Sequence, residues 1–181
     1  MKKFRTRFLL AAALMAATVP AVTLAQVISL PERATPRPQT TNGVPHVQIG
    51  VTADPALSDA LLRRVDKFPG VALGATRVSL PGAIGFQLDP AVELAQPNSI
   101  VGGREFAHLH PDGSLHASLE PNLAQQAISA GWAVEHPWAK RRRGWEGFVM
   151  IYTPSNQEEL EVVYELVRAS FNFVTGQSFN N

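Results

Sequence analysis

Three of the five histidines in the chain lie within the nine residues 108–116. His108 and His110 are two positions apart, so in an extended strand their side chains leave the same face. The Pro-Asp-Gly run at 111–113 is typical of a three-residue hairpin loop, because it combines a fixed φ, an Asx side chain and a glycine that tolerates positive φ. The sequence therefore predicts a β-hairpin around these histidines.

The loop length sets which residues of the two strands face each other. His110 then pairs with Ser114 and His108 with His116, so all three histidines share one face. The same register places Phe106 opposite Ser118 and Arg104 opposite Glu120. A bulge at Gly113 is the alternative, and it would separate His116 from the other two histidines.

The other face of the predicted hairpin is apolar. It pairs Leu109 with Leu115 and Ala107 with Ala117, which is typical of a strand pair with one face on the core. Glu105 falls on this apolar face, where an unpaired carboxylate is costly. We expect Glu105 either to lie at the strand end in water or to be a functional acid.

Two kinds of chemistry fit the histidine face. Uncharged imidazoles bind divalent transition metals, with Glu105 or Asp112 as a possible oxygen ligand. Alternatively, one of His108, His110 and His116 is a general base, since an imidazole titrates near neutral pH and takes protons from enols or phenols. A polar, solvent-facing side of the hairpin would need neither function, and the spacing alone does not choose among the three.

A second group of residues lies at 131–138. Trp132 and Trp138 flank Glu135 and His136, so the tryptophans could form the walls of a small-molecule pocket that holds an acid and a base. The alternative is that the tryptophans pack in the core and the polar pair lies in a loop. On the first interpretation, these four residues are candidate substrate-binding residues.

Residues 1–25 have the pattern of a secretory signal peptide. A basic start is followed by an apolar stretch and by Thr23-Leu24-Ala25, which predicts cleavage near Ala25/Gln26 and a periplasmic or secreted protein without a membrane span. Four of the 16 basic residues lie in this segment, so the remaining chain is acidic and nucleic acid is not an expected partner. The absence of cysteine excludes disulfides and thiolate metal ligands.

The rest of the chain, after residue 25, is predicted to form one domain with flanking segments. Residues 26–45 form a proline-rich linker or extended arm, residues 46–176 a domain, and residues 177–181 a tail. We predict an α+β fold with one antiparallel sheet packed by about three helices on one face, so that the histidines lie on the other face. The expected elements besides the hairpin are strands at 47–51, 71–80, 83–88 and 148–152, and helices at 55–68, 123–130 and 157–173.

Several motifs resemble the luciferase-domain family. They are the run from Glu105 to His116, residues 127–132, Glu135-His136-Pro137, residues 147–154 and residues 158–160. The resemblance covers roughly residues 46–176. This family includes the luciferases of luminous fungi, which oxidise a hydroxylated pyrone with molecular oxygen, without flavin or an established metal, and release carbon dioxide and light.

The resemblance implies an oxygen-dependent oxidoreductase that acts on a small enolic or phenolic compound without a cofactor, and the signal-peptide pattern adds the expectation that it is exported, which departs from the fungal members. His108, His110, His116 and Glu105 are then the candidate catalytic residues, with His108 or His110 as the base and Glu105 or Glu135 orienting it. Trp132 and Trp138 would keep the pocket dry. The alternative is a non-catalytic envelope protein that binds a divalent metal or a small ligand at the histidine cluster.

Overall fold

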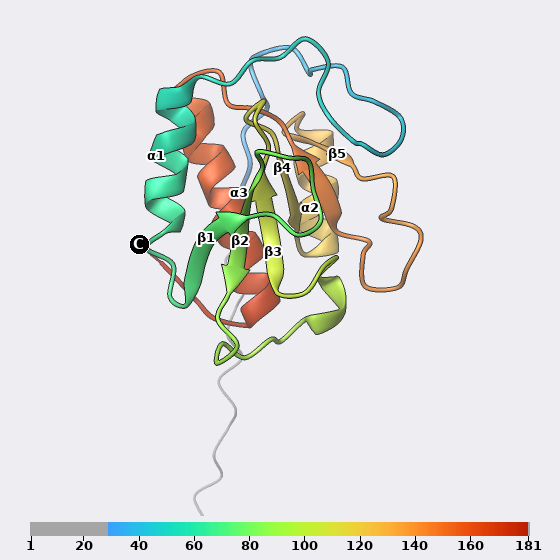
Figure 1. Cartoon of the computed structure of the whole chain (residues 1–181). Coiled ribbons are helices and arrows are strands. Elements are labelled where there is room, and N and C mark those ends of the chain that lie inside the picture. The colour runs from blue at the N-terminus through green and yellow to red at the C-terminus, as the bar shows by residue number, and fades with distance from the viewer. Residues whose placement is uncertain (1–28, 181) are drawn as a thin grey trace, which may run out of the picture.

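A six-stranded antiparallel sheet forms the middle of the molecule (Figure 1), in a computed structural model that describes residues 29–180. Its strands are β1 (Val71–Ala75), β2 (Ile84–Leu88), β3 (Glu105–Leu109), β4 (Leu115–Ser118), β5 (Ala133–Glu135) and β6 (Phe148–Ile151). Their order across the sheet is β1-β2-β3-β4-β6-β5. The predicted signal peptide, residues 1–25, lies outside the described residues.

Three α-helices cover one face of this sheet within residues 29–180 (Figure 1). They are α1 (Pro55–Val65), α2 (Pro121–Ser129) and α3 (Gln157–Thr175), and a short 3₁₀ turn, η1, spans Pro97–Ser99. Helix α3 packs on β3 and β4, α1 packs on α3, and α2 packs on β5. The predicted α+β fold is confirmed. No helix in this part of the chain is long and apolar enough to cross a bilayer.

The helices begin and end at residues that satisfy their free backbone groups. Asp54 accepts a hydrogen bond from the Ala56 N–H at the start of α1, and Asn156 accepts one from the Glu159 N–H at the start of α3. Helix α3 ends at Gly176, whose φ of 71° is the left-handed conformation that glycine adopts without strain. These local signals explain why the predicted helices lie close to the observed ones.

The core lies between the sheet and the helices. Phe106 of β3 contacts Phe171 of α3, with ring centroids 5.8 Å apart, and both side chains are almost fully buried. Leu115 and Ala117 of β4 belong to the same cluster. Burial of this apolar face leaves the opposite face of β3 and β4 for polar side chains.

The predicted hairpin is confirmed in its register. Ala107 pairs with Ala117, His108 with His116 and Leu109 with Leu115. The backbone N–H of His110 donates to the Ser114 carbonyl at 2.8 Å. The alternative register, with a bulge at Gly113, is therefore wrong.

A bulge interrupts β3 at its other end, on the side of β2. Phe86 pairs with Ala107 but Gln87 pairs with Glu105, so Phe106 is an extra residue in β3. Phe106 and Ala107 both enter the core, and Glu105 turns to the histidine face. The predicted positions of Phe106 on the histidine face and Glu105 on the apolar face are therefore wrong.

Three further predictions are corrected. Residues 47–51 form no strand but a single bridge between Gln48 and Thr40, and β1 ends at Ala75 instead of residue 80. The chain leaves β1 there because the next two residues, Thr76 and Arg77, donate to Glu105. Arg104 does not meet Glu120: it donates to the Leu88 and Val92 carbonyls, whereas Glu120 caps α2.

Candidate functional site

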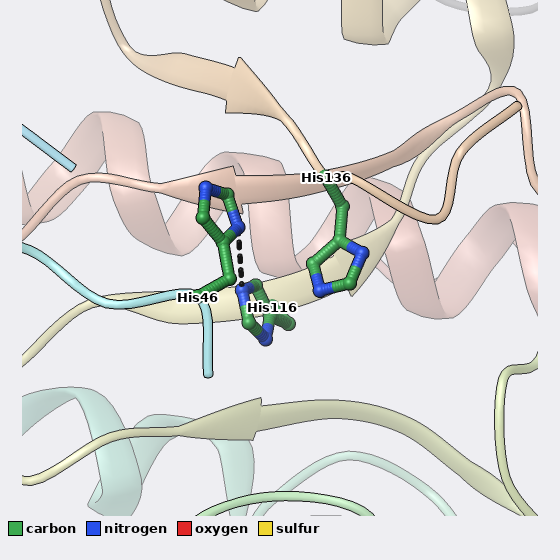
Figure 2. Close-up of side chains that lie close together, drawn as sticks. All are labelled: His46, His116 and His136. Carbon is green, nitrogen blue, oxygen red and sulfur yellow. Dashed lines mark hydrogen bonds between the residues drawn. The ribbon is translucent and has the colours of Figure 1, made fainter. Parts of the chain in front are cut away.

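All five histidines of the chain meet around one cavity of about 300 Å³. His108 and His110 come from β3 and the residue after it, His116 from β4, His136 from the residue after β5, and His46 from the position directly after the proline-rich arm. Each is between 3% and 5% exposed. Figure 2 shows how His46 and His136 approach His116 from different segments.

Hydrogen bonds link Glu105 and three of the histidines in a row. Nδ1 of His108 lies 2.8 Å from Oε1 of Glu105, and Nε2 of His108 lies 3.1 Å from Nδ1 of His116. Nε2 of His116 in turn lies 3.2 Å from Nδ1 of His46. Because a carboxylate only accepts, the Glu105 contact places a proton on Nδ1 of His108 and leaves its Nε2 as an acceptor in the uncharged ring.

Glu105 is the buried acid of the site. It also accepts hydrogen bonds from the Thr76 hydroxyl at 2.7 Å, the Arg77 N–H at 3.0 Å and the Gln87 amide at 2.6 Å. Burial alone would raise the pKa of Glu105, but the hydrogen bonds from His108, Thr76 and Arg77 outweigh burial and lower that pKa. Glu105 is therefore a charged carboxylate that holds His108 in one orientation.

His110 has its orientation set by a separate pair of residues. The Ser114 hydroxyl donates to Oδ1 of Asp112 at 2.7 Å, so its oxygen must accept from Nδ1 of His110, which lies 2.9 Å away. Nε2 of His110 then carries a lone pair. This nitrogen is buried and has no hydrogen-bond partner among the described residues.

His136 presents the opposite group to the cavity. The backbone N–H of Trp138 donates to Nδ1 of His136 at 3.0 Å. An uncharged ring with an acceptor at Nδ1 keeps its proton on Nε2. His136 is thus a hydrogen-bond donor where His110 is an acceptor.

Burial keeps four of these histidines, His46, His110, His116 and His136, uncharged near neutral pH. It lowers the pKa of His46, that of His110 to about 4, and that of His136 to about 3. Burial also places the pKa of His116 well below its ordinary value, and the neighbouring imidazoles lower it further. Near neutral pH these rings are in the form that binds metal ions and accepts protons.

The predicted site residues divide into two groups. Glu105, His108, His110 and His116 meet as one cluster, and His136 and Trp138 line the same cavity. Trp132 and Glu135 do not line it. Trp132 is buried elsewhere and donates to the Pro31 carbonyl at 2.6 Å, and Glu135 forms an ion pair with Lys140 at 2.8 Å. Glu135 therefore does not orient a histidine.

His46 is the site residue that the sequence analysis missed. The residues next to His46 form no recognisable motif. The signal that could have pointed to His46 is that the chain has only five histidines. Gln48, two residues further on, holds His46 in place: its backbone N–H donates to Asp112 at 3.3 Å, and its side-chain amide donates to the Thr153 hydroxyl at 2.6 Å. Asp112 therefore positions both His110 and the segment that carries His46.

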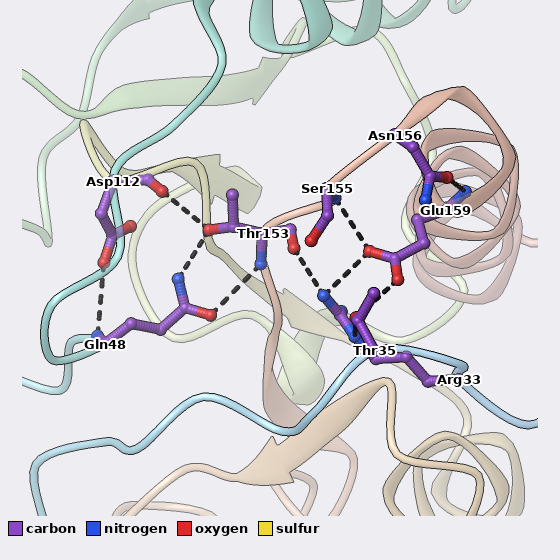
Figure 3. Close-up of polar contacts among 8 residues, drawn as sticks. All are labelled: Arg33, Thr35, Gln48, Asp112, Thr153, Ser155, Asn156 and Glu159. Atoms are coloured by element: carbon purple, nitrogen blue, oxygen red, sulfur yellow. Dashed lines mark hydrogen bonds and ion pairs between the residues drawn. The ribbon is translucent and has the colours of Figure 1, made fainter.

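The arm is anchored again further from the cavity, at the start of α3 (Figure 3). Arg33 forms a buried ion pair with Glu159 at 2.9 Å and donates to the Thr153 carbonyl at 2.9 Å. Thr35 donates to the same glutamate at 2.6 Å. The proline-rich segment is therefore an extended arm. Arg33 and Thr35 hold it on the domain before His46, and Gln48 holds the chain just after His46.

The fold and the site together define a small α+β domain with a histidine-lined cavity on the sheet face opposite the helices. Residues 103–170 match the family model of the luciferase domain. The chain is 30% identical over 165 residues to the luciferases of Armillaria gallica and Armillaria mellea, covering 81% of this chain and 61% of each relative. The predicted resemblance to the luciferase-domain family is confirmed.

The similarity extends to a luciferase of a second fungal genus. The luciferase of Neonothopanus nambi is 35% identical over 78 residues, which cover 40% of this chain and 28% of that protein. This chain spans 61% of the length of the Armillaria relatives. No solved structure matches it.

Proposed function

We propose that this chain is a luciferase-like, oxygen-dependent oxidoreductase that acts on a small enolic or phenolic compound in the five-histidine cavity. The observation that carries the proposal is the cavity itself. It holds imidazoles whose hydrogen bonds set donor and acceptor nitrogens, such as those of His110 and His136, and its volume of about 300 Å³ suits one small ring compound.

The reaction needs an electron-rich anion made from the substrate. The substrate hydroxyl loses its proton within the cluster, and the electron pair of the resulting anion forms a C–O bond with molecular oxygen. The peroxide anion so formed regains a proton and leaves as a hydroperoxide or breaks down further. Both electrons come from the substrate, so no separate reductant is required.

The walls of the cavity favour this chemistry. Trp138 and Phe148 line it together with the histidines, so water is limited around the reacting atoms. His136, whose Nε2 carries a proton, supplies a hydrogen-bond donor that can hold the anionic oxygen of the substrate. Donor and acceptor nitrogens in one apolar cavity match the needs of an enolate intermediate.

Oxygen uptake tests this function directly. The full chain is mixed with a panel of hydroxypyrones, enolic ketones and catechols, and oxygen consumption is followed with an electrode. We expect turnover with at least one class, and the loss of turnover in His108→Ala with the fold intact by circular dichroism. Glu135→Gln is the control, because Glu135 lies outside the cavity and its ion pair is exposed. Full activity in His108→Ala would contradict the proposal.

Export is part of the same proposal. Its support is the pattern of residues 1–25, followed by a chain without cysteine. Expression in a Gram-negative host, followed by mass spectrometry of the periplasmic fraction, should find a chain that begins near Gln26. Recovery of the uncleaved chain from the cytoplasm would count against export.

A second candidate function is a binding protein without turnover. It is favoured by the buried, unpartnered Nε2 of His110, which suits a tightly held ligand as well as a reaction. Saturable binding of hydroxypyrones by calorimetry, without oxygen uptake, would support this second function.

A further inference from the structure

The three histidines of the β3–β4 hairpin offer ring nitrogens that lie within 4.8 Å of one another. We propose that they bind one divalent transition-metal ion, through Nε2 of His108, Nε2 of His110 and Nδ1 of His116. Three ligands from two paired strands leave the remaining coordination positions open toward the cavity, as in catalytic metal sites.

Each proposed ligand is held at its other ring nitrogen. Nδ1 of His108 bonds Glu105 at 2.8 Å, Nδ1 of His110 bonds Ser114 at 2.9 Å, and Nε2 of His116 bonds Nδ1 of His46 at 3.2 Å. Histidine ligands in proteins almost always donate this second N–H to a hydrogen-bond acceptor, commonly a carboxylate, a backbone carbonyl or water, which sets the tautomer and orientation of the ring. His108 and His110 meet that requirement, and His116 meets it when its proton lies on Nε2 and is donated to His46.

The separation of the facing nitrogens also fits an ion. Nε2 of His108 and Nδ1 of His116 are 3.1 Å apart. Two ligands of a tetrahedral ion at bond lengths of about 2.0–2.1 Å have nitrogens roughly 3.3 Å apart. In the row of hydrogen bonds Nδ1 of His116 donates to Nε2 of His108, so binding of an ion between them requires the His116 proton to lie on Nε2 instead, where Nδ1 of His46 can accept it.

The unpartnered nitrogen of His110 is an independent observation. Ser114 and Asp112 force its lone pair onto Nε2, and that atom is buried without a partner among the described residues. A buried polar atom without a partner costs free energy, so the site is incomplete as it stands. A metal ion shared with His108 and His116 completes it.

A second set of histidines in the cavity is less suited to bind the ion. Nitrogens of His46, His116 and His136 also lie within 4.8 Å of one another. However, Nδ1 of His136 accepts the Trp138 N–H, so its Nε2 keeps a proton and offers no lone pair. His136 therefore serves as the matched control for the proposed ligands.

The donor atoms indicate the kind of ion. Glu105 and Asp112, which the sequence offered as oxygen ligands, both orient histidines instead. A set of imidazole nitrogens suits zinc, copper, nickel or iron and is a poor match for magnesium or calcium. If the proposed function holds, an ion here would bind the substrate oxygen and favour its deprotonation as a Lewis acid, in place of a histidine base.

Titration of the full chain with Co²⁺ and Zn²⁺, after removal of metal by a chelator, tests the site without any substrate. We expect one equivalent to bind, with visible absorption from bound Co²⁺. Stoichiometric binding should be lost in His108→Ala and His110→Ala and kept in His136→Ala. Ser114→Ala should weaken binding by about 10–100-fold, because it removes only the acceptor behind His110.

The outcomes separate this inference from the proposed function. Folded wild-type protein that binds neither ion, or His110→Ala that binds as tightly as wild type, overturns the metal site. Loss in His136→Ala with retention in His108→Ala overturns it too, because the ion would then lie among the other three histidines. If circular dichroism shows that an alanine variant of a histidine is unfolded, metal binding by Ser114→Ala decides between the outcomes. Weakened binding supports the site, and binding as tight as in the wild type contradicts it. A protein that binds metal but consumes no oxygen supports the metal site and contradicts the proposed function alone.

Discussion

Nδ1 of His108 donates to the carboxylate of Glu105 at 2.8 Å, although regular alternation along β3 would place the two side chains on opposite faces of the sheet. The extra residue Phe106 reverses the alternation between them. A single bulge therefore both buries an aromatic ring in the core and brings a charged acid to the histidine cluster.

The burial of Glu105 predicts that its removal is costly. In Glu105→Ala, His108, Thr76, the Arg77 N–H and Gln87 all lose their acceptor, and we expect a loss of about 3 kcal/mol in the free energy of unfolding. Urea unfolding followed by fluorescence measures it. Glu135→Ala is the matched control and should cost at most about 1 kcal/mol, because its ion pair is exposed. Equal costs would contradict the assigned role of Glu105.

Two paired glycines, Gly74 and Gly85, test how closely the Glu105 carboxylate packs against the sheet. Gly85 of β2 pairs with Gly74 of β1, but a Cβ at Gly85 would lie 2.5 Å from Oε2 of Glu105, whereas nothing lies within 4 Å of a Cβ at Gly74. We expect Gly85→Ala to displace the carboxylate and lower the free energy of unfolding by about 1–3 kcal/mol. Gly74→Ala should leave it unchanged or slightly higher. Thermal melts of both variants measure the difference, and an unaffected Gly85→Ala would argue against the observed packing.

The ion pair that anchors the arm predicts that two glutamates of α3 differ in how much they contribute to the free energy of unfolding. Glu159 is buried against Arg33, whereas Glu161 forms an exposed pair with Arg64. Glu159→Ala leaves a buried guanidinium without its partner, so we expect a loss of about 3 kcal/mol and faster cleavage by trypsin at Arg33. Glu161→Ala should cost at most about 1 kcal/mol. Equal protection of the arm in both variants would show that Arg33 does not anchor it.

The uncharged histidines predict a stability that depends on pH. In metal-free protein, the native pKa is about 3 for His136 and about 4 for His110, against about 6.5 when unfolded. The unfolded chain therefore binds more protons below pH 6.5, and stability falls as the pH drops from about 7 toward 4. At pH 5 the loss is on the order of 2 kcal/mol for each of these histidines. The urea midpoint of unfolding is measured at pH 7.5 and at pH 5.0, in the presence of a chelator. The change in midpoint between the two pH values should be smaller in His136→Asn than in the wild-type protein. An equal change in both proteins would contradict the lowered pKa of His136.

Much of the fold and part of the site follow from local sequence. The hairpin register could be predicted, because the Pro-Asp-Gly loop and the spacing of His108, His110 and His116 act over only a few residues. Helix α3 could be predicted for the same reason, since its cap and its apolar stripe are both local signals. The wrong strand at 47–51 shows the limit of such signals, because strand pairing also requires a partner.

The sequence by itself determined that three histidines share one strand-pair face and that an acid lies next to them. Only the tertiary structure decided which face that acid occupies, because the bulge at Phe106 depends on how β3 pairs with β2 and packs on α3. It also decided that His46 and His136 complete the cavity. Those two residues are brought together by an arm and a loop that are far apart in the chain, and contacts of that kind leave no periodic pattern in the sequence.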